Sequence, residues 1–172
     1  FNGNCVVDNC KISEVFYGVW VGYQGTPGPS NLTISNNVLY HCGQSIVIGD
    51  MNADSSITNV TISGNRIDGN GVWYDDADVV HADGIHIQPV NGGTSSVNQL
   101  NIYGNDFGPD MGAHCTAEVY LEGDNIKTWK VYNNVFRLSN PTVTNGAIYH
   151  KGKTGGLIAN NTFVGTQGGG NA

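Results

Sequence analysis

The sequence contains few of the residues that build helices. Only six of its 172 residues are Leu and three are Glu, two types with high helix propensity. Gly and Asn are abundant instead, with 25 and 22 copies. Both adopt the positive φ of tight turns at low cost. The composition therefore argues against a helical protein and favours many short strands joined by tight turns.

Positive charge is also scarce. Seven Lys and Arg stand against 14 Asp and Glu, which gives a formal net charge of −7 with no basic run. Nucleic-acid binding rests on clustered positive charge, so we expect none. The sequence also lacks a run of about 18 apolar residues, the length needed for a membrane-spanning helix, so we expect no membrane span.

The four cysteines show no metal-binding spacing such as C-x-x-C. They are interpreted as buried small apolar residues, with a Cys5–Cys10 bridge as the alternative. Three N-glycosylation sequons begin at Asn31, Asn59 and Asn160. They favour an extracellular or secreted protein that carries glycans at these three positions.

Internal repetition is the strongest pattern in the sequence. The segments LTISNNVL, VTISGNRI, LNIYGNDF and WKVYNNVF share one pattern, and CVVDNCKI and GLIANNTF follow it more loosely. Their sixth positions are separated by 27, 28, 40, 29 and 27 residues. Four intervals are nearly equal, and the third contains an insertion of about 12 residues, at about 68–83.

A second set of short segments lies between these motifs and alternates apolar and polar residues, as strands do. Its members are GVWVG, SIVIG, GIHIQ, EVYLE and AIYHK. One repeat therefore carries at least two strands and pairs with the repeats above and below it. We predict an all-β, right-handed parallel β-helix (solenoid) of about five to six coils. It forms a single domain over 1–166, followed by a Gly-rich tail or linker at 167–172. Because the chain opens inside repeat-like sequence, we expect an excised domain or a mature fragment.

Alternation within the strands predicts which residues point inward. One predicted interior row contains Ile34, Ile62, Ile102, Val131 and Ile158; a second contains Leu39, Ile67, Phe107, Phe136 and Phe163; a third contains Val19, Ile46, Ile85, Val119 and Ile148. The Asn at the sixth position of successive repeats is predicted to form a ladder of side-chain amides.

With its N-N-x-F/I coil motif, the chain resembles the pectin-lyase-like β-helix superfamily over nearly its whole length. The resemblance implies the fold. It does not select an activity, because that superfamily includes lyases, hydrolases, epimerases, phage tailspikes and adhesins.

The outward positions of the second strand are predicted to form one solvent-facing surface. Its two rows are Trp20, Val47, His86, Tyr120 and Tyr149, and then Gly22, Gly49, Gln88, Glu122 and Lys151. Sugar rings stack on exposed aromatic side chains, so this surface is a candidate glycan groove. We expect Trp20, Tyr120, Glu122, Tyr149 and Lys151 to bind substrate there.

The insertion reads NGVWYDDADVVHADGIHIQ, from Asn70 to Gln88. A single long loop on an even solenoid is typical of a functional segment. It leads into the strand of His86, so we expect it to lie over the aromatic surface. Trp73 and Tyr74 in this loop are further candidates for substrate binding.

Three chemistries compete for the loop. First, Asp83 and a second carboxylate act as an acid/base pair on a glycosidic bond, with His86, Asp78 and His81 as further catalytic candidates. HADGIHI resembles the N-T-D-G-I-D segment of polygalacturonase-type hydrolases, which implies that Asp83 is catalytic. The Asp-Asp, Gly-His-Gly and Arg-Ile-Lys motifs of that family have no match here.

Second, Asp75, Asp76 and Asp78 hold Ca²⁺, a hard cation that takes oxygen ligands. That ion would bridge this acidic protein to an acidic polysaccharide in a lyase reaction, with His86 or Lys151 as base. Third, His81 and His86 join Asp78 or Asp83 around a transition metal.

These patterns favour an extracellular β-helix protein with a polysaccharide-facing groove. A polysaccharide lyase or glycoside hydrolase is the favoured enzyme, although the residues leave open whether catalysis occurs. The alternative is a non-catalytic structural β-helix, such as a filament, adhesin or tailspike-like subunit, which stacks end to end or on further β-helix coils.

Overall fold

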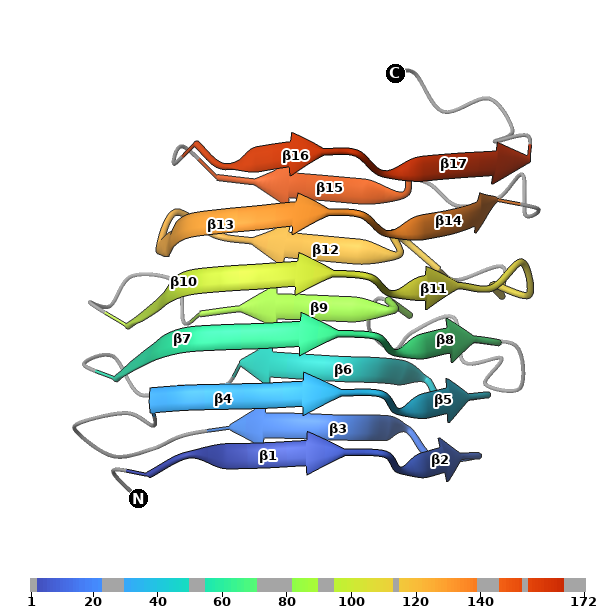
Figure 1. Cartoon of the computed structure of the whole chain (residues 1–172), viewed down its shortest axis with the longest axis horizontal. Coiled ribbons are helices and arrows are strands. Elements are labelled where there is room, and N and C mark those ends of the chain that lie inside the picture. Colours follow the sequence, from blue (N-terminus) through green and yellow to red (C-terminus); the bar gives the residue numbers. More distant parts are fainter. Residues whose placement is uncertain are drawn as a thin grey trace.

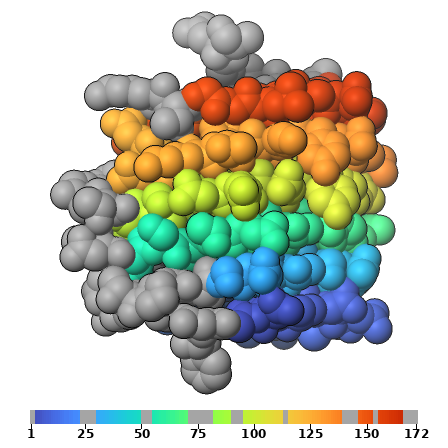
Figure 2. Space-filling model, turned by 60° about the vertical axis from the view of Figure 1, so that its left-hand side comes forward, coloured from blue at the N-terminus to red at the C-terminus, as the bar shows by residue number. Residues whose placement is uncertain are grey.

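The computed structural model describes residues 3–22, 30–49, 55–70, 82–89, 95–112, 115–138, 146–152 and 155–165. The strands of these ranges form three parallel sheets, and successive strands of the chain belong to different sheets in turn. Each turn of the chain is one coil, and the coils stack from β1 at one end to β17 at the other (Figure 1). The space-filling view shows the coils as successive layers from blue to red (Figure 2).

The first sheet, sheet A, contains the strand of the LTIS-type motif from each coil. Its six strands within the described residues are β1 (Cys5–Asp8), β4 (Ser30–Ser35), β7 (Ser56–Ser63), β10 (Ser96–Tyr103), β13 (Ile126–Tyr132) and β16 (Leu157–Ala159).

The second sheet, sheet B, contains the short strand that follows each ladder Asn. Its six described strands are β2 (Lys11–Ser13), β5 (Val38–Tyr40), β8 (Arg66–Asp68), β11 (Asp106–Phe107), β14 (Val135–Leu138) and β17 (Thr162–Gly165).

The third sheet, sheet C, contains the GVWVG-type segments. Its five described strands are β3 (Tyr17–Gly22), β6 (Gln44–Gly49), β9 (Ile85–Gln88), β12 (Val119–Glu122) and β15 (Ile148–Lys151). The predicted fold class is therefore confirmed.

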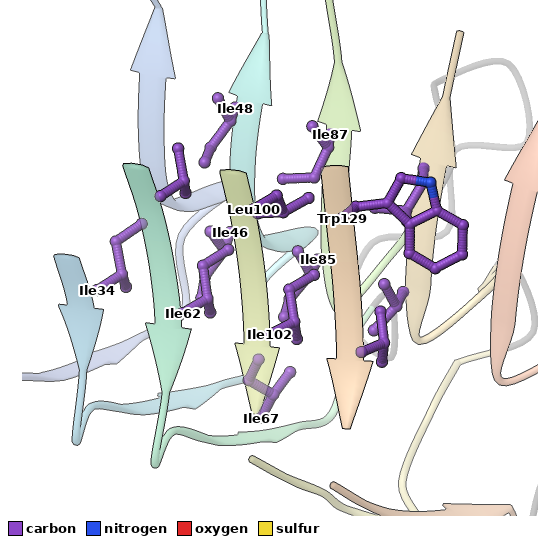
Figure 3. Packing of buried hydrophobic residues seen from close by; sticks show 14 of the residues in the cluster. Ile34, Ile46, Ile48, Ile62, Ile67, Ile85, Ile87, Leu100, Ile102 and Trp129 are labelled. Atoms are coloured by element: carbon purple, nitrogen blue, oxygen red, sulfur yellow. The ribbon is translucent and has the colours of Figure 1, made fainter. Parts of the chain in front are cut away.

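The register of the sheets confirms the predicted interior rows. Ile34 pairs with Ile62, which pairs with Ile102, and the third row pairs in the same way through sheet C. Isoleucines of sheets A and C meet across the interior (Figure 3). In the second row, the rings of Phe107 and Phe136 stack with centroids 4.7 Å apart. No coil buries its apolar side alone, so the stack itself supplies the core.

The corner between sheets A and B explains the N-N and G-N pairs of the repeat. The first residue of each pair has positive φ, as at Asn36 (54°) and Gly64 (65°), where Asn and Gly are least strained. The second residue is a buried ladder Asn. Asn65 Nδ2 donates to Asn105 Oδ1 at 2.9 Å and to the Ile34 carbonyl at 3.0 Å.

The same amide bonds recur along the stack. They link Asn37 to Asn65, Asn105 to Asn134, and Asn134 to Asn161, each at 3.0 Å. The predicted ladder is therefore confirmed. It ends at Cys10, whose backbone N–H donates to Asn37 Oδ1 at 2.9 Å.

The cysteines are all free thiols, so the Cys5–Cys10 alternative is wrong. Cys42 and Cys115 are buried as expected, whereas Cys5 and Cys10 are exposed at the first coil. Within the described ranges, no helix is long and apolar enough to cross a membrane.

Candidate functional site

The outer side of sheet C has the two rows that alternation predicts. Trp20, Val47, His86, Tyr120 and Tyr149 pair in register from β3 to β15. Their exposure differs from the prediction. Trp20 is 54% exposed, but His86 and Tyr120 are only 2% and 4% exposed. The expectation that the centre of this row faces solvent is therefore wrong, and only its ends are accessible.

Asp83 lies in the corner before β9 and is fully buried. Its Oδ1 accepts a hydrogen bond from the Thr116 hydroxyl and one from the Ala117 N–H at 3.0 Å. Oδ2 accepts no hydrogen bond from the described residues. Burial raises the pKa of this carboxyl to about 7, against the lowering effect of Thr116 and Ala117.

Asn70 joins the two ends of the insertion. Its Nδ2 donates to the Asp83 carbonyl at 2.5 Å, and its Oδ1 accepts from the Ser45 hydroxyl at 2.7 Å. All three residues are fully buried. Asp83 is thus held through its backbone carbonyl by Asn70 from its own coil, and through its carboxyl group by Thr116 and Ala117 from the next.

His86 lies between two carboxyl groups. Its Nδ1 is 3.4 Å from Asp83 Oδ2, and its Nε2 is 3.4 Å from Glu122 Oε2. Gln44 Nε2 is also 3.5 Å from Nδ1. The other oxygen of Glu122 accepts a hydrogen bond from Lys151 Nζ at 3.3 Å.

Asp83, His86, Glu122 and Lys151 therefore form one continuous row of titratable groups. The row runs from a fully buried carboxyl to an exposed ammonium group. An imidazole between two carboxyl groups can take a proton from one and give it to the other, which is the elementary step of general acid–base chemistry.

Glu118 is a further acid in this region, and the charge of Asp83 acts on it. It precedes β12, is fully buried, and has no hydrogen-bond partner for either carboxyl oxygen among the described residues. Burial raises its pKa well above the usual value, and the negative charges of Asp68 and Asp83 raise it further.

A signal for Glu118 is present in the sequence. The equivalent positions in the other coils are Gly18, Ser45, Gly84 and Ala147, all of them small residues. A Glu in a row of small residues indicates an unusual buried carboxyl.

Aromatic side chains gather at both ends of the row. Tyr17 and Trp20 stack with ring centroids 5.9 Å apart at the β3 end, and both are exposed. Tyr120 and Tyr149 stack at 5.0 Å towards the β15 end. Burial, followed by the charge of Glu122, raises the pKa of Tyr120 to about 12, so its hydroxyl remains protonated.

The other predicted site residues lie outside the described residues: Trp73, Tyr74, Asp75, Asp76, Asp78 and His81. The Ca²⁺ and transition-metal hypotheses depend on them and stay predictions. Within the described part of the chain, no group of three His, Cys, Asp or Glu side chains is placed to hold a metal ion.

The three sequon residues are exposed. Asn31 Nδ2 donates to Asn4 Oδ1 at 2.9 Å, and Asn59 Nδ2 donates to Asn31 Oδ1 at 2.5 Å. Asn31 and Asn59 thus occupy neighbouring rungs of an outer amide ladder. Glycosylation of Asn31, Asn59 and Asn160 stays a prediction.

Three parallel sheets wound into a stack of coils define the class of this protein as a parallel β-helix. The family model for the right-handed β-helix region matches residues 1–107, more than half of the chain. The chain belongs to this family. No curated protein and no solved structure matches it significantly.

Proposed function

We propose that this β-helix is an extracellular carbohydrate-active protein that binds a polysaccharide on the outer side of sheet C. The row from Asp83 through His86 and Glu122 to Lys151 carries the proposal. A buried carboxyl with a pKa near neutrality, in contact with an imidazole, is typical of acid–base sites. Asp83 Oδ2 accepts no hydrogen bond from the described residues and faces His86 Nδ1 at 3.4 Å.

Burial decreases along the row from Asp83 to Lys151, and this difference suggests a different role for each end of the row. Glu122 and Lys151, at the accessible end, would contact the sugar. His86 and Asp83 would supply or take up the proton from behind. Trp20 and Tyr149 lie at the two ends of the surface, where they would bind sugar rings on either side of the reacting bond.

The test is a screen of polysaccharides, with and without Ca²⁺, that records binding and product release separately. Hydrolysis gives new reducing ends, and a lyase also gives products that absorb in the ultraviolet. Asp83→Asn and His86→Gln should abolish product release and retain binding, while Trp20→Ala should weaken binding. Arg137→Gln, on sheet B, is the control that should change neither.

Binding without product release by the native protein would leave a carbohydrate-binding module without catalysis. If no polysaccharide is bound or cleaved, the proposal is wrong.

A structural role is the second candidate, and one observation favours it. Ile158 and Phe163 belong to interior rows, yet each is about half-exposed at the β16–β17 end of the stack. Within the described residues β16 and β17 are edge strands of their sheets, and exposed core side chains beside an edge strand can pair with further β-structure. A subunit that polymerises end to end would use this surface.

A further inference from the structure

We infer that sheet C binds a neutral polysaccharide rather than a polyuronate. The inference rests on the proposed function, because it names the class of glycan for that same surface. It follows from where the cationic side chains lie on the solenoid.

Seven residues of the chain are Lys or Arg, and most lie on the other two sheets. Lys127 and Lys130 belong to β13 of sheet A. Lys11, Arg66 and Arg137 belong to sheet B, where Arg137 binds Asp106 at 3.0 Å. Among the described residues, Lys151 is the single cation in the strands of sheet C. Lys153, the seventh, lies outside them.

Lys151 is already neutralised. Its ammonium group lies 3.3 Å from Glu122 Oε1, on the neighbouring strand. A uronate that approached this ammonium group would have to displace Glu122 or share the cation with it. Recognition of a carboxylate requires an available cation or a set of oriented donors, and a matched internal pair supplies neither at full strength.

The sequence around β6 and β9 adds further acidic residues. In the sequence, the segments that flank β6 and β9, at 50–54, 71–81 and 90–94, contain five Asp and no Lys or Arg. With a formal net charge of −7, the chain disfavours the approach of a polyuronate at low salt.

The same surface offers aromatic rings and hydrogen-bonding groups that can bind a neutral sugar. The Tyr17–Trp20 pair presents exposed aromatic rings that can pack against the apolar side of a sugar ring. Trp20 lies directly against Gly22, where an added Cβ would be 3.0 Å from the ring. At the other end, the Glu122–Lys151 pair can accept from and donate to hydroxyl groups without a net charge in the ligand.

The experiment compares polymers that differ only in charge. Alginate and polygalacturonate are each tested beside their carboxyl-reduced forms, together with β-1,4-glucan, xylan and mannan. Binding to the whole chain is measured by calorimetry at about 0.01 M and about 0.5 M salt, because screening acts over roughly 10 Å at 0.1 M. We expect the neutral forms to bind at least about tenfold more tightly at low salt, with little change at high salt.

The variant Glu122→Gln tests the role of Lys151 directly, because it removes the negative charge that neutralises this ammonium group. We expect it to raise the affinity for alginate roughly fivefold at low salt and to lose that gain at high salt. Lys130→Gln on sheet A is the matched control and should leave both affinities unchanged. Thermal unfolding confirms that each variant is folded.

The outcomes separate the inference from the proposed function. Tighter binding of the acidic polymers, either directly or only with Ca²⁺, overturns the inference and leaves a glycan-binding protein. Equal binding of charged and reduced polymers also overturns it. If neither class of polymer binds, the proposed function itself is wrong.

Discussion

At the scale of single residues, Asp83 is costly to ionise because it is fully buried and one of its carboxyl oxygens accepts no hydrogen bond from the described residues. Its folded pKa of about 7 lies above the ordinary value of 3.8. Between these values the folded chain binds the proton more tightly than the unfolded chain. The stabilisation is therefore complete below about pH 4 and is lost as the pH rises through about 7.

We predict that Asp83→Asn flattens the dependence of stability on pH. The difference between 3.8 and about 7 corresponds to a contribution on the order of 4 kcal/mol, lost by the native protein between these pH values. The Asn side chain carries no titrating proton and still accepts from Thr116 and Ala117. Chemical unfolding followed from pH 4 to pH 8 measures the change.

Asp8→Asn is the control for this experiment. Hydrogen bonds from Ser35 and Asn36 lower the pKa of Asp8, so its contribution is lost only as the pH falls below the ordinary range. Its removal should leave the slope near neutral pH unchanged. Glu118→Gln should flatten the curve further, because burial also raises the pKa of Glu118. A native protein whose stability rises from pH 5 to pH 8 would contradict this account.

At the scale of the elements, the corner between sheets A and B joins the coils. Asn105 Oδ1 accepts from the backbone N–H of Asn65 at 3.0 Å and from its side-chain amide at 2.9 Å. Asn105 Nδ2 donates to the Ile62 carbonyl at 3.1 Å and to Asn134 Oδ1 at 3.0 Å. One side chain thus satisfies polar groups in both neighbouring coils and none of them can reach water.

We predict that Asn105→Ala costs roughly 3 kcal/mol or more, since it leaves several buried polar groups without partners. Asn161→Ala is the matched control at the last rung, which is partly exposed. There water can replace the lost bonds, so the cost should be about 1 kcal/mol. Denaturant unfolding of the two variants decides the point, and equal losses would show that burial of the ladder is not what stabilises it.

The elements also show how far sequence reasoning reaches in a solenoid. The repeat interval and the alternation of apolar residues predict the fold, the interior rows and the Asn ladder. These features are periodic, so the same sequence pattern recurs in each coil and supports the prediction several times over. The same alternation predicts that His86, Glu122 and Lys151 lie on one side of sheet C, with Asp83 at the start of the strand that carries His86.

Burial on the outer side of sheet C cannot be predicted in the same way. Alternation says to which side His86 and Tyr120 point, but it does not say what covers that side. The alternation of residues also fails to predict that Ile158 is exposed, for a related reason. Its row is interior, but it lies in the final described coil of sheet A, where the next layer of packing is missing from the described residues.

At the scale of the whole molecule, the stack has two unlike ends. The β16–β17 end presents the half-exposed interior residues Ile158 and Phe163, and Phe163 stacks on Phe136 at 5.2 Å. At the other end, Val7 and Ile12 of the same two rows are partly buried. A head-to-tail contact between two copies would continue both rows and the parallel sheets. Such a contact is heterologous and can repeat without closing.

The ladder limits the strength of that contact. Every internal junction from Asn37 onward has an Asn on both sides, but a head-to-tail junction would place Cys10 above Asn161. A thiol is a much weaker acceptor than an amide oxygen. Association through these ends should therefore be reversible and dependent on concentration, unlike the bonding between coils.

We predict that Phe163→Lys abolishes this association, because it places a charge on the apolar end of an interior row. Val164→Lys is the matched control. Val164 is 48% exposed against 53% for Phe163, but it is the next residue on β17 and points to the outer side of sheet B. Sedimentation velocity from about 1 µM to about 100 µM should show association of the native chain and of Val164→Lys, and a monomer for Phe163→Lys. If both variants lose association equally, the contact is not at the end of the stack. If the native chain stays monomeric throughout, the end-to-end contact is excluded at these concentrations.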